Sequence, residues 1–404
     1  MRGQATLLLL GVMLLSAALI VGLATLAWQR SEHWRLQHVA DSAARAGSMV
    51  LARNLNFQAL TNRALIANQV VIAQLVGIQS WFAMLKDGSE RTAIVTSWVP
   101  YLNALMLKLM KITVQFEQLL SHGLRALIAL QQSIIQALSL AQRAAHLAFV
   151  GAANRTMGDI IEQQVSGLTW EAWHVEHGLP VPYGILWWPN LTTVSTRQAR
   201  AKELVTLTQQ SRDGFSKARS YDWLKVAGIT LSKAGGTELQ VLDNGRWNWQ
   251  GLDTTSLHLR WLFLRTELSW ARGAKQLLAG SLQQAASAYG ESGKRNPKAT
   301  RDARRLATSM RALTLPFSYT AVAGDLLKPP KVLVRLQQQG SAKTVETIVV
   351  AGAEVFYSRP SALFRRADGR FERGNLFNPL WQSRLMPLTH VERLLLGLTW
   401  PSVS

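Results

Sequence analysis

The longest apolar stretch of the chain lies near its N-terminus. An uncharged, mostly apolar run extends from Ala5 to Trp28 after the basic residue Arg2, and charge returns at Arg30. At about 1.5 Å per residue, about 20 residues of helix cross the hydrocarbon core of a bilayer. The pattern predicts a single N-terminal transmembrane helix within residues 1–30. A cleaved signal peptide is the alternative, but its apolar core is normally only about 7–15 residues long.

Two long proline-free segments follow this run and predict a long α-helical region over 31–165. The first, 31–85, is expected to end at a turn at Lys86-Asp-Gly-Ser. The second extends from Tyr101 to about Arg155, and a break near Pro100 separates the two. The arrangement predicts a helical stalk or hairpin.

The second helical segment carries an apolar seam with spacings of 4, 3, 4 and 3, which is typical of a coiled coil. The seam consists of Leu105, Leu109, Ile112, Phe116 and Leu119. Farther along, Leu124 to Leu140 is apolar nearly all round and must be covered. The cover is either the helix 31–85 of the same chain or a partner copy.

The first helical segment has a surface of unusually small residues. They include Ala40, Ala43, Ala44 and Gly47. Small residues let a second helix approach closely, so these four are candidates for helix packing or assembly. Asp41 and Arg45 are four residues apart and form either an exposed pair, which contributes a few tenths of a kcal/mol, or a register contact with a neighbouring helix.

The composition changes after the helical region. Gly167–Asn190 mixes tryptophan with proline and predicts irregular structure, whereas Ser195–Leu224 has a polar helical pattern. We expect 166–235 to be an aromatic, proline-rich and helical connector, followed by an α+β domain over 236–404.

Strand patterns dominate this last region. Asn244-Gly245 predicts a hairpin between Glu238–Leu242 and Trp247–Gln250. Further strands are predicted at His258–Glu267, Lys331–Gln337 and Val345–Tyr357, with helices at Ala274–Tyr289 and Ala299–Leu313. Because helices come first and a mixed, β-rich domain later, the fold class is α+β.

The charge of the chain is strongly basic, with 44 Lys and Arg against 24 Asp and Glu and a net charge of +20. Such a charge attracts phosphate-rich surfaces. The densest basic groups lie within 294–305 and 359–373. Basic residues do not alternate with aromatic ones, so we expect a solvated surface near a membrane and no nucleic acid. With no cysteine, the chain has no disulfide, no cysteine zinc site and no thiol nucleophile.

Few residues point to catalysis. His174 and His177 are three apart, whereas zinc-binding helices place their histidines four apart. A trio of Asp253, Ser256 and His258 lacks the signature of an oxyanion hole or a strained nucleophile turn. We therefore expect no enzyme, no metal and no cofactor.

Tryptophan is abundant, with 15 residues, so it needs its own interpretation. Trp247 and Trp249 are two residues apart and share one face of the predicted strand. They pack either in the core, which we favour, or as a platform for a carbohydrate or a partner.

Several segments resemble a known family. Arg2-Gly-Gln before the apolar run, His38–Gly47 and Ala52–Gln74 are similar to the membrane-anchored TadE/TadG-like proteins of tight-adherence (Tad/Flp) pilus systems. Leu242–Thr254 and Asn375–Leu385 resemble longer members more weakly. The positions that carry the resemblance are Gly3, Gln4, Asp41, Asn56, Asn62, Arg63, Asn68 and Gln69.

The resemblance implies a bacterial inner-membrane anchor with the C-terminal body in the periplasm. The implied role is a minor pilin, pseudopilin or scaffold in pilus assembly or secretion, with inner-membrane lipid, other pilus-assembly proteins or pilins, and a second copy as partners. Prepilin-like members have a glutamate where this chain has Leu8, which favours a permanent anchor. The alternative is a membrane-tethered extracytoplasmic binding module for an anionic or glycan surface.

Overall fold

The computed structural model forms two compact units. The first comprises Met1–Leu60, Arg143–Thr192 and Ala321–Ser404, and the second comprises Thr61–Gln142 and Thr193–Thr320. Each unit is built from discontinuous segments, so the boundaries of the units differ from those of the four ranges expected from the sequence. The structure describes residues 2–98, 100–176, 179–182, 191–197, 199–261, 264–279, 290–322, 330–340, 346–360, 368–370 and 372–397.

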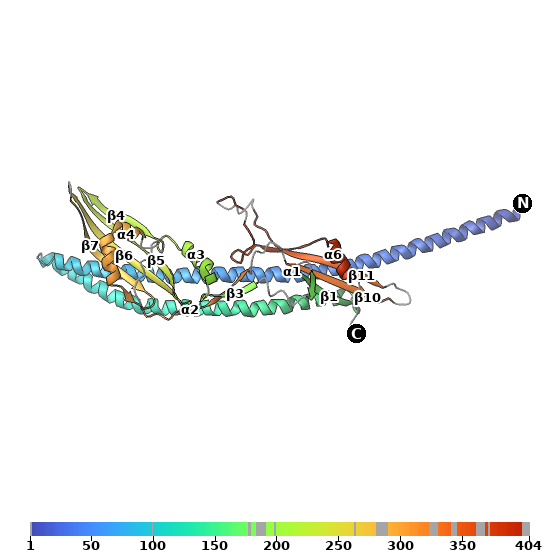
Figure 1. The fold of residues 1–404 in the computed structure, drawn as a ribbon, viewed down its shortest axis with the longest axis horizontal. Helices are drawn as coiled ribbons and strands as arrows, with labels where there is room; N and C mark the ends of the chain where they lie inside the picture. The colour runs from blue at the N-terminus through green and yellow to red at the C-terminus, as the bar shows by residue number, and fades with distance from the viewer. Residues whose placement is uncertain are drawn as a thin grey trace. The chain divides into compact units, whose positions relative to one another are not determined.

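Helix α1 runs from Arg2 to Val95 (Figure 1). The turn predicted at Lys86-Asp-Gly-Ser is wrong, because the helix continues through it. The Ser89 hydroxyl donates to the carbonyl of Lys86 at 2.8 Å, and Arg91 pairs with Asp87 one turn earlier at 3.3 Å. Gly88 marks a close contact instead of a turn: a Cβ added there would lie 3.0 Å from the Cβ of Ala271.

Helix α2 spans Pro100–Gln164, which confirms the predicted break near Pro100. Proline is favoured in the first turn of a helix, where its missing N–H costs no hydrogen bond. Leu124, Ile128 and Ile135 are buried within the second unit. The all-apolar part of α2 is therefore covered in part by its own chain.

The first unit contains a sheet with the strand order β12-β11-β10-β1-β2. Each strand of this sheet is antiparallel to its neighbours. The strands are β1 (Thr169–Glu176), β2 (Leu179–Pro182), β10 (Lys331–Gln338), β11 (Thr347–Tyr357) and β12 (Trp381–Leu385). The runs in β10 and β11 are rich in β-branched residues and confirm the predicted strands. Helix α6 (His390–Gly397) follows.

The prediction of irregular structure for Gly167–Asn190 is wrong where the structure describes it, because β1 and β2 lie there. Residues 183–190 lie outside the described part. Pairing with β10 over six residues, from Thr169↔Gln337 to His174↔Val332, supplies the hydrogen bonds that order β1.

One buried core joins the helices and the sheet of the first unit. It contains Leu36, Leu51 and Leu55 from α1, together with residues of α2 and of the sheet. The last two groups include Ala153, Met157, Ile161, Val334, Ala351 and Val355. The helical stalk is therefore part of a packed domain from Leu36 onward.

The second unit contains a sheet ordered β4-β5-β6-β7-β8. Its strands are β4 (Arg219–Val226), β5 (Ile229–Val241), β6 (Trp247–Trp261), β7 (Leu264–Gln276) and β8 (Thr308–Ser309), with only β8 parallel to its neighbour. A separate two-stranded sheet pairs β3 (Leu191–Ser195) with β9 (Ser318–Val322).

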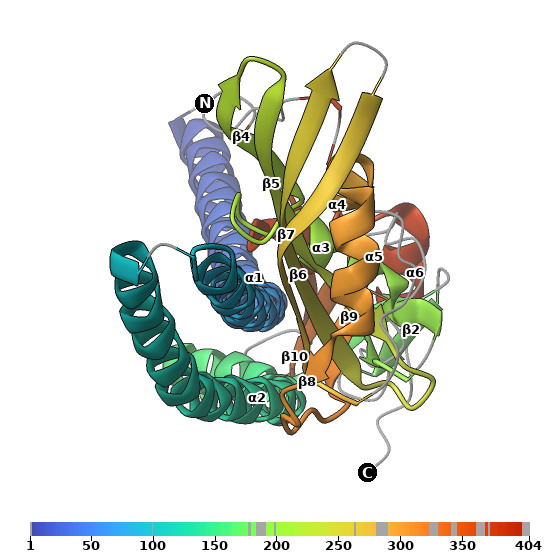
Figure 2. The same cartoon turned by 90° about the vertical axis from the view of Figure 1, so that its left-hand side faces the viewer.

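Helices cover both faces of the five-stranded sheet (Figure 2). Helices α4 (Gly290–Arg295) and α5 (Pro297–Arg305) lie on one face, and α1 lies on the other. The approach of α1 is close, because a Cβ on Gly273 of β7 would lie 2.1 Å from the carbonyl oxygen of Ser80.

The hairpin predicted at Asn244-Gly245 is confirmed. Strands β5 and β6 pair from Val241↔Trp247 outward, and Gly245 has φ +78°, which glycine adopts without strain. The strand predicted at His258–Glu267 is instead two strands, since β6 ends at Trp261 and β7 begins at Leu264. The same alternation continues in both strands, so the sequence pattern does not mark the reversal.

Three helix predictions are wrong over part of their length. Among the described residues of Ser195–Leu224, η2 (Ala199–Ala201) and α3 (Lys202–Gln210) are helical and the rest is not. The Asp213 carboxylate accepts hydrogen bonds from the N–H groups of Phe215 and Ser216 and forms a turn. Residues 274–276 belong to β7, and 280–289 are outside the described part. Helix α5 ends at Arg305, after which β8 pairs with β7.

Candidate membrane anchor and assembly surface

The N-terminal part of α1 exposes its large apolar side chains on all sides. From Leu9 to Trp28 these side chains are between 57% and 72% exposed, and the most apolar 18-residue window of α1 has no buried residue. Figure 1 shows this stretch, toward the N label, without another element beside it. A helix that is apolar all round and uncovered requires an apolar environment.

Two helices among the described residues are long and apolar enough to cross a membrane. They are α1 and α2, and 28% of the apolar window in α2 is buried, against 0% in α1. Length and composition are therefore compatible with anchoring through α1, whereas α2 packs partly within its own chain.

The exposed apolar stretch ends at a charged boundary. Arg35 pairs with Glu32 at 3.5 Å, and Leu36, the next residue, is only 2% exposed. The surroundings of α1 thus change from open to packed within one helical turn.

The four small residues predicted to mediate helix packing lie in the core of the first unit. Ala40, Ala43 and Ala44 are fully buried, and Gly47 is buried against α2. A Cβ on Gly47 would lie 2.5 Å from Sδ of Met157. The close approach occurs between two helices of one chain, and a role of these residues in contacts between chains stays a prediction.

Asn56, a position of the family resemblance, holds the edge strand of the first unit. Its Nδ2 donates to the carbonyl of Trp381 at 2.9 Å, and its Oδ1 accepts from the N–H of Trp381 at 3.0 Å. A side-chain amide can satisfy one donor and one acceptor of a backbone in this way. Asn56 thereby fixes the first residue of β12 to α1.

Asn62 and Gln69 likewise fix α1 to other elements of the second unit through side-chain hydrogen bonds. Nδ2 of Asn62 donates to the carbonyl of Thr320 at 2.8 Å, and its Oδ1 accepts from Gln142 of α2 at 2.7 Å. Oε1 of Gln69 accepts from the indole N–H of Trp249 at 2.9 Å. These buried amides tie α1 to α2, β9 and β6.

The remaining positions of the resemblance have smaller contacts. Asp41 accepts a hydrogen bond from Gln37 at 3.0 Å, Asn68 donates to the carbonyl of Ala64 at 2.7 Å, and Arg63 is exposed. Gly3 and Gln4 lie in the first turns of α1.

Trp247 and Trp249 are core residues, with exposed fractions of 2% and 0%. The ring of Trp247 packs edge-on against Phe317 at 5.0 Å between centroids. The interpretation of this pair as core is confirmed, and that of a binding platform is wrong for these two residues.

The three residues considered as a catalytic trio form hydrogen bonds with different partners. The Ser256 hydroxyl donates to Glu267 at 2.7 Å, and Nε2 of His258 lies 3.0 Å from Oδ1 of Asn296. Asp253 accepts from Ser80 at 2.7 Å and from Arg219 at 2.6 Å. Of the two histidines, His174 lies in β1 and His177 lies outside the described residues, among which no cluster suited to a metal ion occurs.

A buried charge cluster in the second unit was not predicted from the sequence. Beside the pair of Asp253 and Arg219, Nζ of Lys233 lies 3.8 Å from Asp253 and 5.2 Å from the ring centre of Trp81. Burial lowers the pKa of Lys233 to about 8, although the charge of Asp253 opposes this shift. The sequence shows no sign of this cluster, because the alternation of polar residues along β5 and β6 is also typical of a strand with one solvated face.

The fold and the exposed helix define an α+β protein that begins with an uncovered apolar helix. Residues 3–54 of this protein match the family model described as "Putative Flp pilus-assembly TadE/G-like". The match covers the exposed apolar stretch and the small-residue segment, and it supports involvement in pilus assembly together with other pilus-assembly components. No curated protein and no solved structure matches the chain.

Proposed function

We propose that this protein is a non-enzymatic, single-pass component of a Tad/Flp-type pilus assembly or secretion apparatus. Leu9–Trp28 anchors it in the bacterial inner membrane, and the two units stand in the periplasm. The observation that supports this most directly is that the exposed apolar stretch lies within the segment matched by the TadE/G-like family model.

The anchor is retained in this proposal, so that the protein acts as a minor pilin, pseudopilin or scaffold held at the membrane. Leu8 stands where prepilin-like relatives have glutamate, which argues against processing. Burial begins at Leu36, shortly after the apolar stretch, so the packed body starts close to the membrane surface. Its partners are inner-membrane lipid and other pilus-assembly proteins.

Topology tests the proposal. A periplasm-active reporter joined after Ser404 is expected to be active and a cytoplasm-active reporter at the same place inactive, with a full-length product in the membrane fraction. Activity of the cytoplasmic reporter would overturn the proposed orientation.

A pair of variants tests the anchor itself. Leu15→Arg combined with Leu19→Arg is expected to release the protein from carbonate-washed membranes, since each arginine costs about 2.5–3.5 kcal/mol at the centre of a spanning helix. Leu313→Arg, at an equally exposed leucine of the second unit, is the control and should leave the protein in the membrane. Retention of the double variant would count against anchoring through this stretch.

A further inference from the structure

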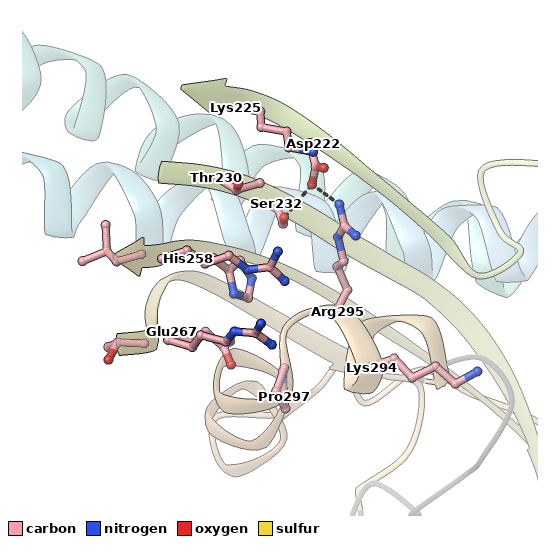
Figure 3. Close-up of a pocket in the computed structure, with 13 residues that line it drawn as sticks. Asp222, Lys225, Thr230, Ser232, His258, Glu267, Lys294, Arg295 and Pro297 are labelled. Carbon is pink, nitrogen blue, oxygen red and sulfur yellow. Dashed lines mark hydrogen bonds and ion pairs between the residues drawn. The ribbon is translucent and has the colours of Figure 1, made fainter. Parts of the chain in front are cut away.

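An open, basic groove lies in the second unit, between the strand ends of its sheet and helices α4 and α5 (Figure 3). Its volume is about 380 Å³. Two carboxylates, Asp222 and Glu267, line it. The cationic lining residues are Lys225, Arg260, Arg265, Lys294 and Arg295.

The strand register brings several of these side chains to one face of the sheet. Lys225, Thr230, His258 and Glu267 are successive cross-strand partners over β4, β5, β6 and β7. Directly paired residues point to the same side, and so do residues two apart along a strand. Arg260 and Arg265, two positions beyond His258 and Glu267, therefore share this face.

The two arginines form a like-charge pair. Arg260 and Arg265 are directly opposite each other in the antiparallel ladder of β6 and β7. Like charges in this position are destabilising. An anion between them would remove the repulsion, so the arrangement favours a bound ligand over an empty groove.

Both carboxylates of the groove already have other partners. Asp222 accepts a hydrogen bond from Ser232 at 2.6 Å and pairs with Arg295 (Figure 3). Glu267 accepts from the N–H groups of Lys298 at 2.8 Å and Ala299 at 3.0 Å, at the start of α5. The negative charge of Glu267 is therefore already stabilised by the N-terminus of α5.

The two opposed arginines of the groove have no ion-pair partner in the described part of the chain. Arg260 and Arg265 form no salt bridge there and are exposed, whereas the charge of Lys225 also acts on the carboxylate of Asp222. The charges and guanidinium N–H groups of the two arginines are available to a ligand.

We propose that this groove binds a ligand that carries two or more phosphate groups. A guanidinium group matches phosphate oxygens with two parallel hydrogen bonds. One phosphate offers enough oxygens for both opposed arginines, and a second phosphate reaches Lys225, whereas a single carboxylate has one charge and two oxygens. The volume is within the range of about 300–1,000 Å³ that small-molecule sites occupy. The phosphates come from a lipid headgroup or from a soluble phosphorylated molecule.

Binding measurements on the full-length protein in phosphatidylcholine nanodiscs test this site. The soluble probe is inorganic tripolyphosphate, and the lipid probe is cardiolipin in phosphatidylcholine vesicles. Arg260→Gln combined with Arg265→Gln is expected to weaken tripolyphosphate binding by about tenfold or more. Arg301→Gln combined with Arg305→Gln removes the same charge from α5 outside the groove and should change binding less than about twofold.

The thermal midpoint provides a second readout, which also shows whether the variant is folded. Removal of the like-charge pair is expected to leave the midpoint unchanged or raised, and tripolyphosphate should raise the midpoint of the wild type but not of the groove variant. Groove-dependent binding of cardiolipin vesicles supports a lipid source, and groove-dependent binding of tripolyphosphate alone supports a soluble one. Equal weakening by both double variants, equal binding of polyglutamate, or binding of neither probe would overturn the proposal. None of these outcomes depends on the reporter topology that tests the pilus role.

Discussion

Gly47 shows how one missing side chain leaves room for a side chain of the neighbouring helix. A Cβ at this position would collide with Met157, whereas at Gly151 on α2 it would meet no atom within 4 Å. Both glycines lie inside helices, where glycine costs roughly 0.5–1 kcal/mol relative to alanine. The contact at Gly47 offsets that cost, and nothing offsets it at Gly151.

We expect Gly151→Ala to raise the free energy of unfolding by about 0.5–1 kcal/mol. Gly47→Ala should bring no such gain, and Gly47→Leu should lower the free energy of unfolding by about 1–3 kcal/mol through overpacking. Urea unfolding of the full chain in detergent measures all three. A stabilised Gly47→Ala variant would contradict the close contact between α1 and α2.

Lys233 makes stability depend on alkaline pH. Its pKa is lowered from 10.5 to about 8 in the folded chain, and its side chain is only 1% exposed. Between these pH values the unfolded chain binds more protons than the folded one, so stability rises with pH through this window. The shift corresponds to a few kcal/mol at about 1.4 kcal/mol per pH unit.

The pH dependence provides a direct measurement. Urea unfolding between pH 7 and 10.5 should give a rising free energy for the wild type and a flatter profile for Lys233→Met. Lys298→Met, at an exposed lysine of the same unit, is the control and should keep the wild-type slope. Equal slopes in all three proteins would show that the buried cluster does not titrate in this range.

At the scale of elements, α2 has two segments whose apolar side chains differ in burial. Leu124, Ile128 and Ile135 are buried, whereas Leu105, Ile112 and Leu119 of the predicted seam are 51%, 61% and 73% exposed. Phe116 of the seam contacts α1, with 5.7 Å between its ring centre and that of Phe82, whereas the three exposed residues keep the spacing of a coiled-coil repeat. A second copy of the same helix satisfies this repeat, which makes the seam the expected contact in a homo-oligomer.

Ile112→Lys combined with Leu119→Lys should weaken self-association of the full chain, and the dissociation constant should rise at least about tenfold because each buried side chain contributes about 1.5–3 kcal/mol. Sedimentation in detergent measures the association. Leu313→Lys, which lies outside α2, is the matched control. An unchanged oligomeric state in the double variant, or a monomeric wild type, would exclude the seam as a contact between copies.

Strands with clear local signals were predictable, and strands specified by distant partners were not. The Asn244-Gly245 hairpin and the runs in β10 and β11 were identified because turn chemistry and β-branched residues act locally. The local pattern of residues 274–276 predicts helix, yet they pair with β6 from Ala274↔Leu252 to Gln276↔Gln250. Tertiary pairing overrides local propensity there.

At the scale of the whole molecule, the sequence indicated the class but not the assembly of the units. The α+β order and the apolar N-terminal helix were visible in the pattern of residues. The contacts that build the units join distant positions, such as Asn56 with Trp381 and Asn62 with Thr320, and one sequence gives no sign of such pairs. The sequence shows no sign of the basic groove either, because only the strand register places Arg260 and Lys225 in the lining of one groove.

The discontinuous construction of the units also orders events during synthesis. Every segment of the second unit has been made once the chain reaches Thr320. The first unit must wait for β12, which ends at Leu385, although its part of α1 is made first. The side of α1 that carries Ser48 and Asn56 therefore stays without its contacts to β12 until Trp381 and Ser383 have been made. The nascent chain therefore exposes this surface while the segments between α1 and β12 are translated, and exposed surfaces of this kind are where chaperones act and misassembly begins.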